Sequence, residues 1–469
     1  MGQTKPTENF RDKISTVDEK GKRIWVFAKK PFGKWFNKRQ VFSYSLLLFL
    51  FSAPFISVDG EPMLLLNLLE RKFIIFGKIF WPQDFYIFAI AMLTGLVFIV
   101  LFTLVFGRLF CGWICPQTIF MEFVFRRIEY WIEGDWTHQK RLEKQPWNRE
   151  KIIKKASKHA LFFFIAFLVA NIFLSYIIGY KEVFDIISDN PLNHFGGLIA
   201  ILVFSFLFYG VFAFMREQVC TTICPYGRLQ SVLLDQNSMV ITYDYVRGEK
   251  RSKFRKNEDR EAEGKGDCID CNQCVNVCPT GIDIRNGTQL ECVNCTACID
   301  ACDHIMESIE KPKGLIRYAS DESIKTGIAF EFSKKAKAYS IVLVLLLGLL
   351  ITLIASRSDF DMTVKRTAGS KLFHKMEGNK IGNIYSMNII NKTNKDLPLE
   401  FRLLEGEGEI KIISESRILP KQDMYKSSFL LIMEGDNIKG LKTYFKLGVY
   451  SNGKLIDKTN VTFIGPAYN

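Results

Sequence analysis

Five uncharged apolar runs interrupt a chain whose other segments are polar and charged, and this alternation indicates the architecture. The runs cover residues 41–58, 85–106, 160–180, 195–215 and 338–355. Each approaches or exceeds the roughly 18–20 residues that a helix needs to cross a bilayer. A further apolar stretch at 63–77 contains Glu70, Arg71 and Lys72, so it predicts an interfacial segment rather than another span. The pattern therefore predicts a membrane region of five helices.

Lysine and arginine residues are distributed unevenly between the segments that join these runs. The segments richest in them are 1–40, 107–159 and 216–337, whereas the poorer ones are 59–84 and 181–194. Because basic loops are retained in the cytoplasm, we expect the N-terminus on that side. Five crossings then place residues 356–469 in the periplasm, outside a bacterial inner membrane.

Beyond about residue 370 the pattern changes from long apolar runs to short alternating segments. Segments 384–389, 397–403 and 444–450 alternate apolar and polar positions, and a Ser-Asn-Gly sequence at 451–453 signals a turn. Short strands at regular spacing predict a small immunoglobulin-like β-sandwich. This region contains no cysteine, so we expect a docking module rather than a reactive one.

Composition narrows the functional classes. The chain carries a formal net charge of +13, with 48% hydrophobic and 24% charged residues. A nucleic-acid partner would require a basic patch within a recognisable binding module, and we identify none. The excess of positive charge is instead explained by basic cytoplasmic loops of a membrane protein. All twelve cysteines lie in short motifs, which indicates metal ligation in a reducing compartment rather than disulfide bonds.

Eight cysteines form the doubled run that is typical of bacterial ferredoxins, with x2, x2, x3 spacing repeated after 13 residues. This spacing predicts two 4Fe-4S clusters, in which the fourth thiolate of each cluster comes from the other run. The predicted ligands are Cys268, Cys271, Cys274 and Cys302 for the first cluster, and Cys292, Cys295, Cys298 and Cys278 for the second. The alternative is zinc, which usually takes two C-x2-C pairs separated by a longer loop. Asp303 stands where proline commonly follows the last cysteine.

The other four cysteines form a repeated C-x3-C-P motif at the ends of two predicted spans. The copies contain Arg108, Cys111, Cys115 and Pro116, and Arg216, Cys220, Cys224 and Pro225. Proline disfavours helix at the preceding residue, so we expect a turn at the membrane surface with accessible thiols. A nearby arginine lowers the pKa of a thiol. The motifs predict a paired site for a soft ion such as Cu(I), or for thiol–disulfide exchange. The alternative is four buried apolar side chains.

The histidines share no ligand spacing with one another. They are His138, His159, His194, His304 and His374. No pair lies in facing spans, so we do not expect a haem-bearing core. His194 and His374 are interpreted as surface residues, with copper ligation as the alternative. His304 is interpreted as part of the surroundings of the first cluster.

In combination, these motifs resemble the FixG/CcoG family of cytochrome c oxidase accessory proteins. The resemblance rests on the Trp-Pro-Gln-Asp-Phe sequence at 81–85 and on the two cysteine segments 107–118 and 220–228. The ferredoxin run and the C-terminal sandwich follow in the family's order, and the match covers nearly the whole chain from about residue 35. The resemblance implies a role in building the cbb-type oxidase, by reduction of Cu(II) to Cu(I) for copper delivery. It also implies a homodimer.

Carried over residue by residue, the resemblance implies that Cys111, Cys115, Cys220 and Cys224 form or flank the copper-reducing site, and that the ferredoxin cysteines supply its electrons. A cytoplasmic electron donor and oxidase-assembly or copper-chaperone partners are expected. The predicted domains are an N-terminal arm (1–40), a four-span membrane region (41–246), a charged linker (247–266), a ferredoxin domain (267–310), a second linker (311–337), the fifth span (338–355) and the sandwich (356–469).

Two other functions are compatible with these motifs. Quinol dehydrogenases of the NapH and NosR type share the C-x3-C-P motifs, and they pass electrons outward from quinol to a reductase. The C-terminal sandwich and the sequence at 81–85 favour the accessory family. The third interpretation is a non-enzymatic assembly scaffold whose clusters only stabilise it.

Overall fold

The computed structural model describes residues 16–18, 20, 22–58, 61–67, 72–75, 77–81, 84–255, 258–328, 331–367, 373–376, 378–393, 395–413, 418–421, 423–438 and 440–466. The chain divides into two units. One comprises the described parts of 16–56, 65–67 and 86–350, and the other those of 57–64, 68–85 and 351–466. Each unit is described by itself.

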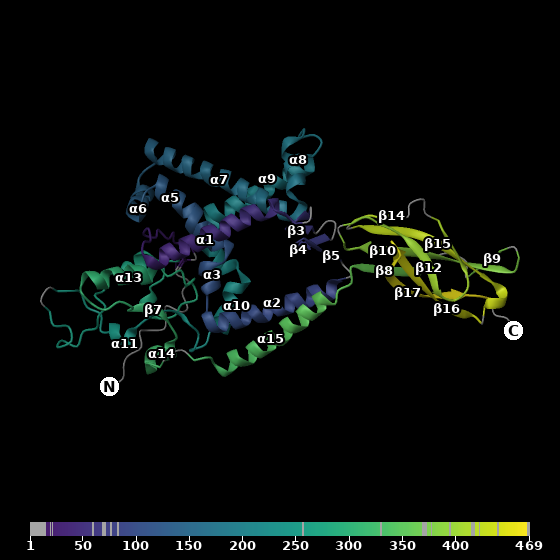
Figure 1. The fold of residues 1–469 in the computed structure, drawn as a ribbon. Helices are drawn as coiled ribbons and strands as arrows, with labels where there is room; N and C mark the ends of the chain where they lie inside the picture. Colours follow the sequence, from purple (N-terminus) through teal and green to yellow (C-terminus); the bar gives the residue numbers. More distant parts are fainter. Residues whose placement is uncertain are drawn as a thin grey trace. The chain divides into compact units, whose positions relative to one another are not determined.

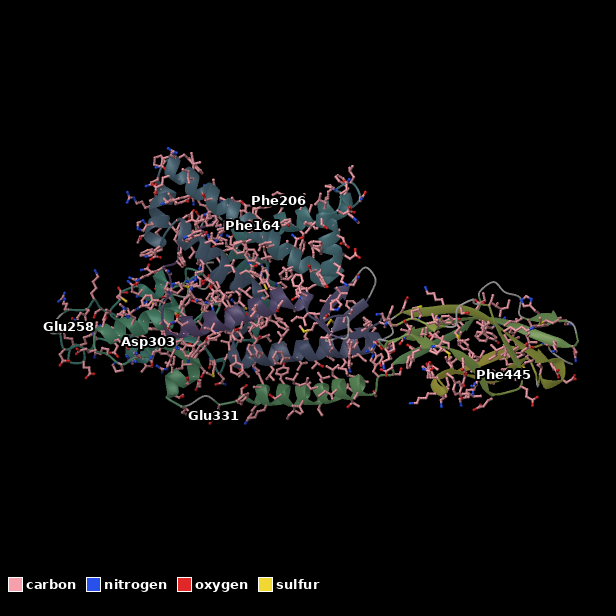
Figure 2. The ribbon with its side chains drawn as sticks, turned by 45° about the horizontal axis from the view of Figure 1, so that its top comes forward. Phe164, Phe206, Glu258, Asp303, Glu331 and Phe445 are labelled. Carbon is pink, nitrogen blue, oxygen red and sulfur yellow. The ribbon has the colours of Figure 1, made fainter. Side chains whose placement is uncertain are left out.

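Four helices in the described part of the chain are long and apolar enough to cross a membrane. They are α2 (Phe85–Phe106), α7 (Arg149–Ile178), α9 with its π-helical extension η5 (Phe195–Gly210 and Val211–Met215), and α15 (Lys334–Ala355). Four of the five predicted spans are therefore found. In Figure 1, α2 and α15 lie side by side, and Leu104 and Val105 pack against Ala336. The exposed rings of Phe164 and Phe206 project from α7 and α9 in Figure 2, as lipid-facing side chains do.

The predicted first span is not among these four helices. Residues 41–58 contribute to α1 (Lys34–Ser52), which ends before Pro54 and continues as a 3-10 turn, η2 (Ala53–Phe55), and a short strand, β1 (Ser57–Val58). Proline has no N–H to donate and clashes with a continuing helix, which explains this early end. The helix also begins seven residues before the predicted run, so it includes the basic side chains of Lys34, Lys38 and Arg39.

Aromatic packing fixes the segment after the first C-x3-C-P motif against the apolar helices. This segment forms the π-helix η4 (Phe120–Phe125) and α5 (Arg126–Ile132). The ring of Phe125 stacks on Phe212 at 4.5 Å between centroids and meets Phe162 edge-on at 4.9 Å. Phe162 lies on α7 and Phe212 in η5, so this buried cluster ties the loop after α2 to the helices beside it.

The segment with eight cysteines forms a compact α+β fold with few regular elements. Its helices are α12 (Gln273–Asn276) and α13 (Ala297–Ser308), and a strand pair, β6 (Val240–Tyr243) and β7 (Ile316–Ala319), closes it in antiparallel register. The N-terminal arm is attached here, because the carboxylate of Asp300 accepts hydrogen bonds from the backbone N–H groups of Trp35 (3.1 Å) and Phe36 (2.7 Å).

The C-terminal unit is a β-sandwich, as the alternating pattern predicted. One sheet has the order β13-β15-β10-β8, with β9 also paired to β10, and the other has the order β12-β16-β17. The strands are β8 (Phe360–Arg366), β9 (His374–Met376), β10 (Lys380–Asn391), β12 (Glu400–Glu405), β13 (Glu409–Ile412), β15 (Met424–Glu434), β16 (Lys442–Ser451) and β17 (Lys454–Ile464). Buried residues such as Met387, Phe429 and Phe445 form the core of this unit. Figure 2 shows Phe445 within it. Asn452 and Gly453 both have positive φ, which the tight hairpin turn between β16 and β17 requires.

Asp84, from the Trp-Pro-Gln-Asp-Phe sequence at 81–85, has a structural role in the same unit. Residues 82 and 83 lie outside the described residues. Asp84 is buried, and its carboxylate binds Arg357 (2.7 Å) and Lys392 (2.8 Å). Burial alone would raise the pKa of Asp84, but the hydrogen bonds from these two cations outweigh it and lower that pKa below its usual value. Asp84 therefore ties the residue before α2 to the sandwich. The predicted interfacial stretch 63–77 contains β3 (Leu64–Asn67) and β4 (Lys72–Ile75); residues 68–71 and 76 lie outside the described residues.

Candidate electron-transfer site

The ferredoxin cysteines surround two separate cavities. Cys268, Cys271, Cys274 and Cys302 line the first cavity, together with Tyr243 and Arg285. Cys278, Cys292, Cys295 and Cys298 line the second, to which Cys274 also contributes. The first cavity therefore receives three thiols from the first run and Cys302 from the second. The second cavity receives three thiols from the second run, Cys278 from the first run as the spacing predicts, and in addition Cys274. The assignment of individual iron ligands stays a prediction.

Paired left-handed residues shape both ligand loops in the same way. Asp270 and Asn272 flank Cys271, Asn294 and Thr296 flank Cys295, and all four flanking residues have φ between 52° and 68°. Successive residues that alternate between right-handed and left-handed conformations turn their N–H groups toward a common concave side. Such loops suit a sulfur-rich anionic cluster, because N–H groups that point at the sulfurs stabilise its negative charge.

The chemistry of the thiols also fits iron–sulfur clusters. Burial raises the pKa of Cys274 to about 12 and that of Cys295 to about 11. Buried thiols of this kind remain protonated at neutral pH unless a metal cation replaces the proton. Among the described residues, no three His, Cys, Asp or Glu side chains converge on a single ion. In a cubane, by contrast, each thiolate binds a different iron, so the four sulfurs stand apart around the cluster.

Two buried polar groups beside the cavities were not found by sequence reasoning. The hydroxyl of Tyr243 interacts with Cys268 and has no nitrogen or oxygen partner among the described residues. The Asn294 side-chain nitrogen is also unpartnered there, and its amide oxygen lies 3.6 Å from the sulfur of Cys292. Buried donors of this kind are the groups that hydrogen-bond to cluster sulfurs and raise a reduction potential. The only sequence signal is their position next to a ligand or at the end of a strand.

The two C-x3-C-P motifs fold alike. Each begins as one helical turn, α3 (Leu109–Trp113) or the π-helix η6 (Val219–Ile223), and each is followed by a helix that starts at the proline, α4 (Pro116–Ile119) or α10 (Pro225–Leu233). Cys115 and Cys224 stand between the two helices with extended backbone, at ψ 121° and 115°. The predicted turn is therefore present, and all four thiols are partly exposed.

The four thiols of these motifs belong to one site. Cys111 interacts electrostatically with Cys115 and Cys224, and Cys220 interacts with the other three. The Cys111 thiol donates to the side-chain oxygen of Gln230 on α10 (3.4 Å), and Arg108 donates to the carbonyl oxygen of Gly227. Contacts from the first motif to α10 therefore hold the two copies together.

The expected effect of the two arginines on these thiols was wrong. Burial raises the pKa of Cys111 to about 11, and the opposing charge of Arg108 does not offset it. Burial also raises the pKa of Cys220 to about 12. Arg216 binds the Glu129 carboxylate at 3.0 and 2.9 Å. Both thiols are therefore poor nucleophiles at neutral pH until a cation displaces their protons.

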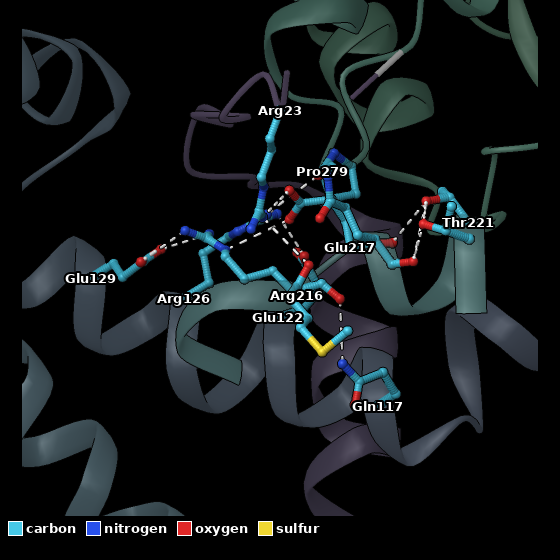
Figure 3. A network of polar contacts seen from close by, with 12 residues as sticks. Arg23, Gln117, Glu122, Arg126, Glu129, Arg216, Glu217, Thr221 and Pro279 are labelled. Atoms are coloured by element: carbon cyan, nitrogen blue, oxygen red, sulfur yellow. Dashed lines mark hydrogen bonds and ion pairs between the residues drawn. The ribbon is translucent and has the colours of Figure 1, made fainter. Parts of the chain in front are cut away.

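A buried ion-pair network surrounds the second motif (Figure 3). Arg126 binds Glu122 (2.6 Å) and donates to the carbonyl oxygen of Pro279 (3.3 Å), and Arg23 of the N-terminal arm binds Glu217 (2.9 Å). Pro279 follows a predicted cluster ligand, so the network joins the membrane region to the ferredoxin loops. Arg126 belongs to the basic segment 107–159, and nothing in the sequence pattern distinguishes it from the other basic residues there.

The surroundings of four histidines are described. His374, interpreted as a surface residue, is half-buried, and its Nε2 is buried without a hydrogen-bond partner among the described residues. His159 bonds the hydroxyl of Tyr209 (2.9 Å), and His194 lies 3.2 Å from Asp189 on the surface. His304 packs edge-on against the ring of Phe32 and is not among the residues that line the first cavity.

The backbone of the first motif lies against the loop of the second cavity. A Cβ atom on Gly112 would stand only 2.3 Å from the carbonyl oxygen of Val293, so only glycine permits this approach. Val293 lies between Cys292 and Cys295. The thiols of Cys111, Cys115, Cys220 and Cys224 form a group, the thiol quartet. This quartet is therefore a neighbour of the second cavity.

Three family models match the chain. They are described as a "4Fe-4S dicluster domain" over residues 215–321, a "4Fe-4S binding domain" over 88–140 and 194–235, and an "IG-like fold at C-terminal of FixG" over 350–466. Protein RdxA of Cereibacter sphaeroides is 34% identical over 375 residues, which are 76% of this chain and 77% of RdxA. The chain belongs to the FixG/RdxA/RdxB family. It has a 4Fe-4S dicluster domain and, in the described residues, four helices that are long and apolar enough to cross a membrane.

Other family members match shorter parts of their own length. Nitrogen fixation protein FixG of Rhizobium meliloti is 36% identical over 64% of this chain and 58% of FixG. Protein RdxB of Cereibacter sphaeroides is 37% identical over 63% of each chain. The crystal structure of a FixG-related protein from Vibrio parahaemolyticus covers 23% of this chain and 97% of its own, at 16% identity and a TM-score of 0.19. That score is too low to support an inference about the fold.

Proposed function

We propose that this chain reduces Cu(II) to Cu(I) at Cys111, Cys115, Cys220 and Cys224, with electrons from its two 4Fe-4S clusters, during assembly of a cbb-type cytochrome c oxidase. The observation that carries the proposal is the contact at Gly112, because it brings the quartet next to the second cavity. Thiolates favour Cu(I) over Cu(II), so a sulfur site next to an electron carrier suits this reaction.

The proposed topology has five spans, with α1 as the first. Its basic residues Lys34, Lys38 and Arg39 gather at the N-terminal end, and from Val41 onward the helix is apolar except for small polar residues. The positive-inside rule then puts the N-terminus, the thiol quartet and the clusters on the cytoplasmic side, and the sandwich in the periplasm. The domain boundaries predicted above and the homodimer belong to this proposal.

The chain's own residues prepare the site for a copper ion. The backbone turn at each proline presents two thiols, and the bonds from Arg108 and Cys111 to α10 hold the two turns together. On binding, Cu(II) displaces the thiol protons, and it becomes Cu(I) by accepting one electron, which 4Fe-4S clusters held by the eight ferredoxin cysteines would supply. A cytoplasmic one-electron carrier restores the electron. The clusters supply single electrons when they are bound.

One observation favours a further 4Fe-4S cluster, instead of copper, as the group that the quartet binds. The model described as a 4Fe-4S binding domain matches both segments that contain the C-x3-C-P motifs. Four thiols can ligate one further cluster, which would relay electrons instead of binding copper. Iron analysis separates the two assignments: about eight iron atoms per chain fit two clusters, and about twelve fit three.

The direct test is anaerobic mixing of reduced protein with Cu(II), followed by a Cu(I)-specific chelator. We expect rapid Cu(I) formation by the native protein and loss of this reaction in the Cys111→Ala/Cys115→Ala/Cys220→Ala/Cys224→Ala variant. The control is Ile114→Val/Ile223→Val, which changes both turns but keeps every thiol. Equal rates in the native and cysteine-free proteins, at equal iron content, would contradict the proposal. Cluster reduction by quinol would favour the quinol dehydrogenases instead.

A further inference from the structure

The two sets of predicted cluster ligands differ in their access to solvent. In the first set Cys271 is exposed, whereas in the second set Cys295 is buried and the other three cysteines are only partly exposed. The second set is enclosed by the first motif instead: Cys111 packs against a buried apolar cluster that contains Val293, Cys295 and Ala297. A soluble protein can therefore approach the first cavity at Cys271, and the second cavity is the one that contacts the quartet.

One buried arginine holds this contact together. Arg39 on α1 is 1% exposed, and its Nε donates to the carbonyl oxygen of Gly112 (2.6 Å) while its Nη1 lies 3.5 Å from the carbonyl oxygen of Cys295. Its guanidinium also lies 4.9 Å from the centre of the Phe123 ring. Arg39 therefore bridges the backbone of a C-x3-C-P turn and the backbone of a cluster loop, from a third element of the fold.

Aromatic residues surround the same junction. Trp35 on α1 meets the ring of Trp113, the residue after Gly112, at 6.4 Å, and it meets Tyr318 at 5.7 Å. The hydroxyl of Tyr318 donates to the carbonyl oxygen of Asn294 (3.2 Å). Packing on both sides of the Gly112 contact thus fixes the turn and the loop in one arrangement.

We infer that electrons leave the dicluster domain through the second cluster, across the Gly112–Val293 contact, and that Arg39 is the positioning residue for this step. The inference rests on the proposed function. In each cycle one electron leaves the second site for Cu(II), which becomes Cu(I), and one electron from the first site replaces it. A cytoplasmic one-electron carrier protein supplies the first site at Cys271.

The first test separates the turn from the loop. Gly112→Ala places a methyl group against the Val293 carbonyl oxygen, and the matched control is Gly210→Ala, where a Cβ meets nothing within 4 Å. We expect Gly112→Ala to slow oxidation of pre-reduced clusters by Cu(II) on the order of tenfold or more, because small displacements of reacting groups cost large rate factors. Oxidation by ferricyanide, which reaches the exposed first site, should keep its native rate.

The second test uses the charge and the shape of Arg39 separately. Arg39→Gln removes a positive charge that interacts with Cys295, so the midpoint potential of the second cluster should become more negative while that of the first stays unchanged. Arg39→Lys should restore this potential because it restores the charge. It should still transfer electrons slowly, since an ammonium group lacks the guanidinium fork that spans two carbonyl groups. Potentiometric EPR and stopped-flow absorbance give the two measurements.

The outcomes distinguish this inference from the proposed function. A native protein that fails to reduce Cu(II) contradicts the function itself. If the native protein reduces Cu(II) and the Gly112→Ala variant does so at the same rate, only the inferred electron route across the Gly112–Val293 contact is contradicted. If Gly112→Ala fails to fold, the Arg39→Lys variant decides. Native electron-transfer rates in Arg39→Lys would overturn the inference. A shift in the midpoint potential of the first cluster in Arg39→Gln would also overturn it.

Discussion

The two C-x3-C-P motifs have the same sequence pattern and different surroundings. The first has Gly112 between its cysteines and lies against the loop of the second cavity. The second has Thr221 at the same position, and Cys220 lines a pocket together with Arg126, Arg216 and Glu217. Equivalent arginines also differ, because Arg108 bonds to α10 whereas Arg216 binds Glu129. A repeat in sequence therefore does not make the two copies equivalent, and we expect the first to receive electrons and the second to be held by the ion-pair network.

The largest expected effect concerns the network behind the second motif. Burial alone would raise the pKa of Glu129, but Arg216, Lys158 and Arg126 lower it, so the group is a buried carboxylate surrounded by cations. Glu129→Ala should destabilise the protein by about 3–5 kcal/mol, because it leaves buried charge uncompensated. Thermal unfolding in detergent measures this. Glu150→Ala, at an exposed pair with Lys154, is the control and should leave the melting temperature near the native value.

The second prediction compares the two thiol pairs directly. Cys111→Ser/Cys115→Ser should slow Cu(I) formation about tenfold more than Cys220→Ser/Cys224→Ser. The reason is that the first turn lies directly against the Val293 backbone at Gly112, whereas Cys220 faces the same loop across a pocket. Stopped-flow mixing with Cu(II) and a Cu(I) chelator gives both rates. Equal losses in the two variants would mean that the quartet acts symmetrically and would remove the distinction drawn here.

The third prediction concerns the pH dependence of the metal-free thiols. Burial raises the pKa of Cys111 to about 11 and of Cys220 to about 12, so both are protonated near neutrality. Because only the thiolate is alkylated, the rate of iodoacetamide labelling should rise about tenfold per pH unit from pH 7 to pH 10. Stability should fall over the range between the ordinary thiol pKa and these raised values, since the unfolded chain loses its protons first. Peptide mass spectrometry resolves each residue, and a plateau below pH 9 would exclude burial as the dominant cause.

The smallest effect is expected for Thr221→Gly, which gives the second motif the glycine of the first. A glycine in a helical turn costs roughly 1 kcal/mol at most, and the substitution brings no cluster loop nearer. The rate of Cu(I) formation should therefore stay at the native value in the same stopped-flow assay. An increase would show that glycine alone, rather than the packing around it, makes a motif competent.

Several features of the site could be predicted because they depend on local spacing. The x2, x2, x3 spacing forces three thiols onto one loop, and the structure places the fourth thiol of the other run at the same cavity. The turn after each C-x3-C pair follows from the proline that comes next. Apolar run length identified four helices that are long and apolar enough to span a membrane. The first run belongs to α1, which ends before Pro54, and its role as a span stays a proposal. Charge counting included Arg39 and Arg126 only among the basic residues of cytoplasmic segments, because burial by partners distant in the sequence leaves no local pattern.

The sequence by itself determined which chemistry the chain carries: soft sulfur ligands at cluster spacing, apolar segments of membrane length, and a cysteine-free alternating region. Only the tertiary structure decided which cluster loop meets which thiol turn, that Arg39 joins them, and that Arg216 serves an ion pair. The physical reason is the distance along the sequence between the residues that determine each feature. Ligand spacing and helix length are fixed by neighbouring residues, whereas the close approach of two backbones at Gly112 depends on segments about 180 residues apart and on the packing that holds both.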